Sequence, residues 1–412
     1  MDGKEYLKFN QENAKKYPIY LKEGYANYYN INSSLVDNFL IISKKDYHCF
    51  SGYYDIDNVS PNGKYLLYLL VKKHSSPCKD KALINVYNLI NNETTQLVET
   101  NAWCWQQGCR MRWIDNERIM FNDYINGHYV SKIFSIITKK ECISFDSVFY
   151  DISLKSNIGL SLNFDRLQIN RPGYGYSNIT NKVEELCNLS EDGIWITNLR
   201  TKSKKLLIKL KDLKDEVLSN PFDNHYINHI VLSPLGDKFM FFHLWARDSL
   251  DMWKMRMIVA NVDGSNRVVV EEQNIISHYC WINNDELLVT KQVNDEYRYF
   301  IYDVNNCSYV KIDDKNLCFD GHPTVLNENS IFVSDTYPLE HSLQELFIYN
   351  IREHKKENIF KGFSDPRLYI EERCDLHPKL SKGKNLINID STFKDGVRSI
   401  FVLKIKEDKY DF

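Results

Sequence analysis

The sequence contains no long apolar run, and this absence excludes several classes of protein. No stretch is long enough to span a bilayer as a helix, and residues 1–10 lack the apolar segment of a secretory signal peptide. Lys and Arg total 52 against 55 Asp and Glu, so no global basic charge favours nucleic acid. We therefore expect a cytoplasmic protein that binds neither a membrane nor nucleic acid.

Cysteine pairs at metal-binding spacing are also missing. The ten cysteines are scattered, and the two closest, Cys104 and Cys109, do not form a Cys-x-x-Cys motif. A zinc site made of cysteines needs tighter clustering, so we expect free thiols in a reducing compartment. No linker rich in Pro, Gly or Ser divides the 412 residues, which indicates one continuous architecture.

What the sequence does contain is a repeat. Around residues 228–243 a histidine precedes a short strand, a turn with Pro234 and Gly236, and a second apolar strand. Pro fixes φ and Gly admits positive φ, so this spacing predicts a hairpin. Seven such copies occur, with turns at residues 60–64, 113–117, 153–159, 233–238, 281–285, 326–330 and 380–383.

The spacing of these copies predicts an all-β fold, a seven-bladed β-propeller. Most copies are about 40–55 residues apart, which is the period of a four-stranded blade. The longer interval before the fourth copy predicts an insertion. Few residues follow the last predicted strand, 400–405, so the seventh blade lacks an outer strand. We expect residues around 38–42 to supply it, so that residues 1–412 form a single closed ring.

Polar residues stand in front of the predicted turns, where the inner strands of a propeller begin and converge on its channel. These positions hold Asp57, Arg110, Tyr150, His229, His278, His322 and His377. A single histidine there would usually be structural, but four in consecutive blades indicate a functional site. Neutral imidazole is the commonest ligand of transition metals, and a catalytic or carboxylate-binding role also fits.

Aromatic and polar segments add candidates for the rim of a pocket. Two phenols, Tyr174 and Tyr176, lie in a glycine-containing loop, where they either stack on a sugar ring or pack on a blade. Arg166 follows Asp165, so it forms either a surface ion pair or a fork for a carboxylate. The candidates for substrate binding are His48, Gln107, Asn122, Tyr174, Tyr176, His243 and Arg373.

Several short motifs resemble those of a known family. They include Gly-Tyr-Tyr-Asp, Trp-Gln-Gln-Gly, Leu-Asn-Phe-x-Arg-Leu, Arg-Pro-Gly-Tyr-Gly-Tyr, Ser-His-x-x-Trp, Asp-Gly-His-Pro and Arg-Cys-Asp-Leu-His-Pro. From about His48 onward, the chain resembles a bacterial family of seven-bladed propellers related to oligogalacturonate lyase and to the ulvan and rhamnose–glucuronate lyases.

This resemblance implies β-elimination at a uronic acid residue of an oligo- or polysaccharide. In that reaction an arginine or a metal neutralises the C6 carboxylate, one side chain removes the C5 proton, and another protonates the leaving oxygen. The catalytic candidates that it implies are Tyr150, Arg166 and His229. The implied ligands of a divalent metal (manganese, or calcium or zinc) are His278, His322 and His377. We expect Tyr150 and Arg166 to face each other, with the guanidinium lowering the pKa of the phenol.

The chain also departs from the family pattern. Gln106, Gln107 and Asn122 stand near the place where ulvan-type enzymes carry catalytic histidines, and none of the three is a base near neutral pH. The complete manganese set, three histidines and a glutamine, cannot be assigned either. Three readings stay open at this point: a lyase on uronate-containing saccharides, a propeller that binds glycans or proteins without chemistry, and a scaffold.

Overall fold

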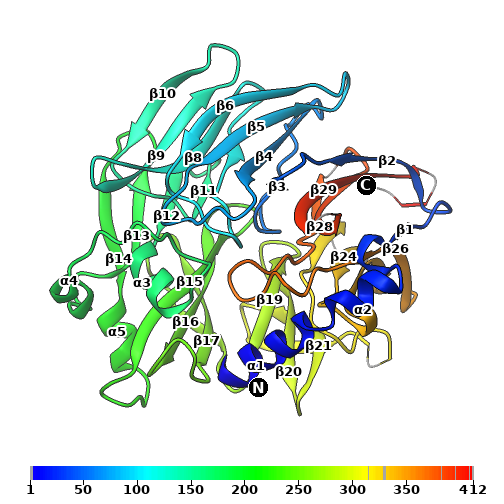
Figure 1. Ribbon diagram of the computed structural model, residues 1–412. Helices are drawn as coiled ribbons and strands as arrows, with labels where there is room; N and C mark the ends of the chain where they lie inside the picture. Colours follow the sequence, from blue (N-terminus) through cyan, green and yellow to red (C-terminus); the bar gives the residue numbers. More distant parts are fainter. Residues whose placement is uncertain are drawn as a thin grey trace.

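The repeats fold as a seven-bladed β-propeller, which confirms the predicted fold class (Figure 1). The structure is a computed structural model, and it describes residues 3–313, 315–327, 331–381, 383–394, 396–407 and 409–410. Seven antiparallel sheets follow one another along the chain, each built mainly from consecutive strands. Most predicted turns join the first two strands of a blade, but residues 328–330 of the sixth turn lie outside the described residues.

The first four blades each contain four consecutive strands. Blade 1 consists of β3 (Tyr47–Phe50), β4 (Tyr65–Lys72), β5 (Ala82–Asn88) and β6 (Thr94–Thr100). Blade 2 consists of β7 (Arg112–Trp113), β8 (Arg118–Ile125), β9 (His128–Ser135) and β10 (Lys140–Phe145). Blade 3 consists of β11 (Asp151–Ser153), β12 (Ile158–Ser161), β13 (Gly193–Asn198) and β14 (Lys204–Lys209). Blade 4 consists of β15 (Asn224–Leu232), β16 (Lys238–Ala246), β17 (Lys254–Asn261) and β18 (Val268–Glu271).

Blade 5 also contains four consecutive strands, β19 (Ile276–Trp281), β20 (Glu286–Val293), β21 (Glu296–Asp303) and β22 (Ser308–Lys311). The last two blades differ, because each takes one strand from the N-terminal region. Blade 6 contains β23 (Thr324–Asn327), β24 (Ile331–Asp335), β25 (Leu343–Asn350) and β26 (Lys355–Phe363), with β1 (Tyr29–Ile31) as a fifth strand. Blade 7 contains β27 (Lys379–Ser381), β28 (Leu386–Lys394) and β29 (Val397–Ile405), and its outer strand is β2 (Val36–Ile42).

The helices are short and lie outside the blades, where strand periodicity gives no signal for them. Two α-helices and a 3-10 turn precede the first strand: α1 (Gly3–Ala14), α2 (Tyr17–Lys22) and η1 (Tyr25–Asn27). The predicted insertion, within blade 3, forms α3 (Phe164–Asn170) and α4 (Val183–Cys187), and α5 (Leu210–Asp215) and η2 (Glu340–Ser342) lie in later connections. None of the helices in the described part of the chain is long and apolar enough to cross a membrane.

The core lies between neighbouring blades, which bury their faces against each other. The largest hydrophobic cluster joins residues of blades 3, 4 and 5, while smaller clusters join blades 1 and 2 and blades 6 and 7. Each blade therefore depends on its neighbours for burial, as expected for a repeat architecture. Burial on both faces explains why strands such as β4 and β16 read as nearly continuous apolar runs.

The inner edge of blade 1 is interrupted by residues 51–57, which enter the central channel. Pairing with β4 stops after Phe50 and resumes at the bridge between Val59 and Leu66. Within this crossing segment, Tyr54 reaches the inner strand of blade 5. Its hydroxyl accepts a hydrogen bond from the Tyr279 backbone N–H at 3.0 Å and donates one to the Tyr279 carbonyl at 2.8 Å. Blade 1 is thereby fastened to blade 5 across the channel.

Substitution of Tyr54 by phenylalanine should destabilise the propeller, because it leaves the buried Tyr279 N–H and C=O without this partner. We expect the free energy of unfolding to fall by about 1–3 kcal/mol in denaturant titrations. Tyr87→Phe is the matched control, since the Tyr87 hydroxyl bonds only to the exposed Asn92 side chain. That variant should stay within about 0.5 kcal/mol of the wild type. Equal stability of the two variants would contradict the prediction.

Candidate functional site

Four histidines from four consecutive blades meet at one end of the channel. His229 lies in β15 and His278 in β19, while His322 and His377 precede β23 and β27. The ring centroids of His278 and His322 are 3.9 Å apart, and those of His322 and His377 are 4.5 Å apart. The His229 ring stacks on Tyr53 at 5.4 Å, and Tyr53 also contacts His322 and His377. The histidine cluster is therefore built around the crossing segment, and all of its rings are buried.

Local backbone geometry turns some of these side chains toward the channel. Arg110, His229 and His377 have φ values of 53°, 58° and 47°, in the left-handed region that residues other than glycine rarely adopt. At His229 the pairing of β15 with β16 shifts register between Asn228 and Val231, as at a β-bulge. Such conformations cost about 1–3 kcal/mol each, and they persist where the surrounding structure fixes them, often at functional sites.

Buried carboxylates orient the histidine rings. His278 Nδ1 lies 3.0 Å from Asp320, and His322 Nδ1 lies 2.9 Å from Asp335. Asp335 also accepts hydrogen bonds from the backbone N–H groups of His322 and His377. A carboxylate on Nδ1 holds the proton there and leaves Nε2 with a free lone pair, which is the usual orientation of a metal-binding histidine.

Three groups in this cluster form a donor set suited to a metal ion. One ligand atom each from His322, Asp375 and His377 lies within 4.8 Å of the others. The Nε2 atoms of His322 and His377 are buried, and no described residue forms a hydrogen bond to either atom. Two imidazole nitrogens and a carboxylate oxygen fit manganese or another divalent transition metal, so the residues present match the metal that the sequence suggests. His278 adjoins this set through its ring contact with His322.

Burial sets the charge of the site. It lowers the pKa of His229, His322 and His377 well below the ordinary value, because the protonated imidazolium would lose its hydration inside the protein. Burial also raises the pKa of the Asp335 carboxyl to about 7, although backbone N–H groups oppose this shift. The imidazoles are therefore neutral at physiological pH, the state in which histidine binds metals or accepts a proton.

The cation beside Tyr150 is Arg110, which corrects the expected pair of Tyr150 and Arg166. The Arg110 guanidinium lies 4.2 Å from the centre of the Tyr150 ring, forms a double hydrogen bond with Asp55, and donates from Nε to the Tyr150 carbonyl. Arg166 instead donates to Asp192 at 2.6 Å and to the Leu186 carbonyl. Its position on α3 directs it into the insertion, where Asp192 neutralises it.

The expected shift of the Tyr150 phenol is also wrong in sign. Burial raises the pKa of Tyr150, and the nearby Arg110 charge offsets only part of that effect. The phenol is therefore protonated at neutral pH. Its hydroxyl accepts a hydrogen bond from Gln107 at 2.8 Å and lies 3.3 Å from His229 Nδ1 and 3.4 Å from Asn228 Oδ1. A protonated phenol beside a neutral imidazole pairs an acid with a base.

Of the predicted substrate-binding residues, Tyr174 contacts the histidine cluster, whereas Asn122 and Tyr176 lie in a layer behind it. Tyr174 lies 5.9 Å from the His229 ring, and its hydroxyl accepts a hydrogen bond from Arg373 at 3.0 Å. Asn122 donates to the Tyr176 hydroxyl at 2.9 Å, and the Tyr176 ring stacks on Phe164 at 4.3 Å. Asn122 and Tyr176 thus form a buried layer that supports Tyr150, whose ring also stacks on Phe164.

Two predicted substrate-binding histidines lie in the bodies of the blades. His48 accepts a hydrogen bond from the Arg398 backbone N–H at 3.1 Å and contacts Trp105. His243 lies 2.9 Å from His225 and accepts a hydrogen bond from Arg256. Within the described residues, both are satisfied by these structural partners and not by the channel cluster. A histidine that bonds to a neighbouring strand inside a blade stands among apolar residues, as a histidine at a pocket rim also does. The sequence around it therefore does not distinguish the two cases.

Several residues of the site were not predicted from the sequence. Tyr53 and Tyr54 contact the histidine rings, whereas Asp57, one of the seven residues expected at the channel, accepts a hydrogen bond from Ser381 at 2.7 Å. Asp375 was not predicted either, although an Asp-x-His pattern occurs twice, at residues 320–322 and 375–377. Residues two apart in an extended segment point to the same side, so this pattern was the available signal.

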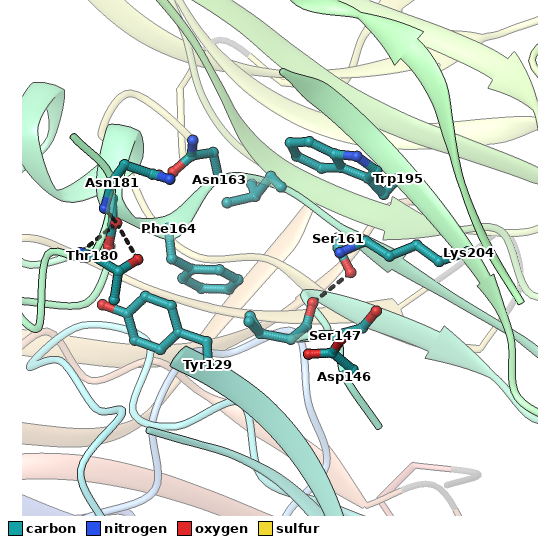
Figure 2. A pocket seen from close by; sticks show the side chains of 13 residues that line it. Tyr129, Asp146, Ser147, Ser161, Asn163, Phe164, Thr180, Asn181, Trp195 and Lys204 are labelled. Carbon is teal, nitrogen blue, oxygen red and sulfur yellow. Dashed lines mark hydrogen bonds between the residues drawn. The ribbon is translucent and has the colours of Figure 1, made fainter. Parts of the chain in front are cut away.

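Two open hollows lie outside the histidine cluster. One, of about 260 Å³, lies beside α3, where the backbone N–H groups of Thr180 and Asn181 donate to the Asp165 carboxylate. Figure 2 shows Thr180 and Asn181 on one side of this hollow and Trp195 on the opposite side. The other, of about 510 Å³, lies in the channel against the crossing segment and is lined by Tyr54, Asp55, Asp57, Val59, Pro61, Trp113, Thr324, Leu380 and Lys384. The crossing segment therefore separates the histidine cluster from this part of the channel.

Comparison with solved structures places the fold beside that of known lyases. An oligogalacturonate lyase in complex with manganese matches 93% of this chain and 98% of its own at 14% identity, with a TM-score of 0.61. The oligogalacturonate lyase of Vibrio parahaemolyticus matches 93% and 100% at 13% identity, also with a TM-score of 0.61. The tricorn protease matches 90% of this chain and 35% of its own at 10% identity and a TM-score of 0.52.

These likenesses show that the chain shares the propeller fold of oligogalacturonate lyases, at identities that establish the fold alone. No protein-family model matches the sequence. No curated protein matches it either. The function must therefore be inferred from the residues of the site.

The buried His48 should make the stability depend on pH. Burial, followed by the Arg398 charge, lowers the pKa of His48 from 6.5 to about 3. The unfolded chain therefore binds a proton that the folded chain excludes, so the free energy of unfolding should fall as the pH drops from about 6.5 toward 3. In His48→Asn, whose amide oxygen can replace Nδ1 as acceptor, urea titrations at pH 7 and pH 5 should show a smaller difference. His128→Asn, at an exposed site, should keep the wild-type difference, and equal differences in both variants would contradict the prediction.

Proposed function

We propose that the protein is a lyase that cleaves a uronic-acid-containing oligo- or polysaccharide by β-elimination at the histidine cluster. The observation that carries this proposal is that one buried place combines three kinds of group. His229 is a neutral imidazole, and Tyr150 is a protonated phenol 3.3 Å from its Nδ1. Arg373 supplies positive charge, and the donor set of His322, Asp375 and His377 can bind a cation.

In this reaction the C5–H and C4–O bonds of the uronate break and a C4=C5 double bond forms. His229 is the general base: with its proton on Nδ1, facing the Tyr150 hydroxyl, its Nε2 lone pair accepts the C5 proton. Tyr150 is the general acid, and its phenolic proton goes to the glycosidic oxygen as that oxygen leaves C4. Gln107 holds the Tyr150 hydroxyl by donating to it at 2.8 Å.

The substrate carboxylate needs a positive partner, because the C5 proton becomes acidic only when that charge is neutralised. Arg373 donates from Nε to Asp375 at 2.8 Å and from Nη2 to Tyr174, and 17% of its side chain remains exposed. It is thus fixed at the edge of the cluster, where a preorganised guanidinium is most effective. A divalent cation held by His322, Asp375 and His377 would add positive charge for the same carboxylate.

Loss of the acid should slow elimination without unfolding the protein. Tyr150→Phe should lower turnover of uronate oligosaccharides by about 10²-fold or more, measured as ultraviolet absorbance of the 4,5-unsaturated product. Tyr65→Phe is the matched control, since Tyr65 stacks on Trp113 away from the histidines, and it should keep wild-type turnover. Unchanged turnover in Tyr150→Phe would remove the acid role. Saturable oligosaccharide binding with no absorbance from the wild type would instead identify a glycan-binding propeller without chemistry.

Removal of a ligand from the donor set should release the metal. Protein purified without chelators should contain about one equivalent of a divalent metal by elemental analysis, and His322→Ala or Asp375→Asn should lose it. His354→Ala changes a histidine in an exposed hairpin and should retain the metal. A metal-free wild-type protein with full turnover would contradict this part of the proposal.

A further inference from the structure

Arg171, which caps the C-terminal end of α3, holds its guanidinium between two aromatic rings. The guanidinium carbon lies 4.1 Å from the centre of the Trp253 ring and 5.3 Å from that of Tyr174. No described acceptor receives a hydrogen bond from this guanidinium. Three buried arginines behave differently: Arg110, Arg166 and Arg256 each donate to a carboxylate. Arg171 alone among these four keeps its N–H edge unused.

The backbone around Arg171 is fixed before any ligand arrives. Pro172 restricts the conformation of the preceding residue, and Gly173 has a φ of 91° that favours glycine. Gly175 packs so tightly on α3 that a Cβ there would lie 2.2 Å from the Phe164 carbonyl oxygen. The Tyr174 N–H donates to the Arg171 carbonyl at 3.2 Å, which closes the turn. The loop thus presents Arg171 without a large ordering cost on binding.

The Tyr174 ring links Arg171 to the histidine cluster. The same ring contacts Arg171, the His229 ring at 5.9 Å and Tyr53 at 6.2 Å, and its hydroxyl receives a hydrogen bond from Arg373. Trp253 lies on the far side of Arg171, in the hairpin between β16 and β17, and is half-buried. A saccharide that occupies the cluster would therefore extend its next residue toward Arg171 and Trp253.

We propose that Arg171, Tyr174 and Trp253 form a second subsite, which binds the acidic group of the sugar next to the one that is cleaved. The inference rests on the proposed function, because it assumes a saccharide at the cluster. Rings cover the faces of the guanidinium, so its N–H edge is left for a planar carboxylate, which it can bind in a bidentate manner. A sulfate ester offers the same oxygen chemistry. The substrate class is thus narrowed to chains with adjacent anionic residues.

The test is calorimetric binding of saccharides with and without a second acidic group. Arg171→Met should weaken binding of trigalacturonate by about 10- to 100-fold, because charge-assisted hydrogen bonds are lost, and should leave galacturonate unchanged. Arg171→Lys keeps the charge but not the fork, so it should show a smaller loss for the trisaccharide. Arg200→Met removes a charge from an exposed hairpin and is the matched control. Thermal unfolding of each variant checks that its fold is intact.

The outcomes of these measurements distinguish the subsite from the lyase activity. A loss that is larger for a sulfated rhamnose–glucuronate oligosaccharide than for trigalacturonate supports the subsite and identifies the sulfate as its ligand. An equal loss for methyl-esterified trigalacturonate, or no loss for any acidic saccharide, overturns it. Binding that depends on Arg171 without unsaturated product retains the subsite and removes the lyase, whereas product formed at wild-type rate and affinity by Arg171→Met retains the lyase and removes the subsite.

Discussion

The hydrogen bonds between the Tyr54 hydroxyl and the Tyr279 backbone are the interaction on which the site depends. They hold residues 51–57 across the channel, and the histidines of the later blades pack against Tyr53 and Tyr54 of that segment. A ring of blades alone would leave an open pore at its axis. Here residues 51–57 of the first blade cross the channel, so side chains from distant parts of the chain share one buried cluster.

Burial decides the protonation of that cluster. It keeps the imidazoles of His229, His322 and His377 neutral and the Tyr150 phenol protonated, while Asp320 and Asp335 orient two of the histidine rings. The positive charges of the site belong to arginines that are already paired with carboxylates, as Arg110 is with Asp55. Such an arrangement is costly for stability. In the proposed elimination, these preorganised groups would need little rearrangement when charge develops in the substrate.

The fold could be predicted from the sequence because each blade repeats the same turn and strand pattern, which a 40–55-residue period makes visible. The convergence of four histidines followed from their equivalent places in that pattern. The partner of Tyr150 could not be predicted, because Arg166 and Arg110 are equally plausible in sequence. The folded insertion pairs Arg166 with Asp192, and the sequence pattern does not indicate this ion pair. Tyr53 and Tyr54 were missed because an irregular segment inside a strand has no periodicity.

The pairing of β2 with β29 has a consequence for biosynthesis. The partner of β2 follows every other described strand in the chain, so an emerging chain exposes the edge of β2 until the ribosome has synthesised the seventh blade. Long-range pairing of this kind is slow to form, and an open edge invites association with other chains. The β2 edge carries Asp37 and Asn38, both exposed, and polar groups of this kind discourage such association while the chain waits. The ring can therefore close only after β29 has been synthesised.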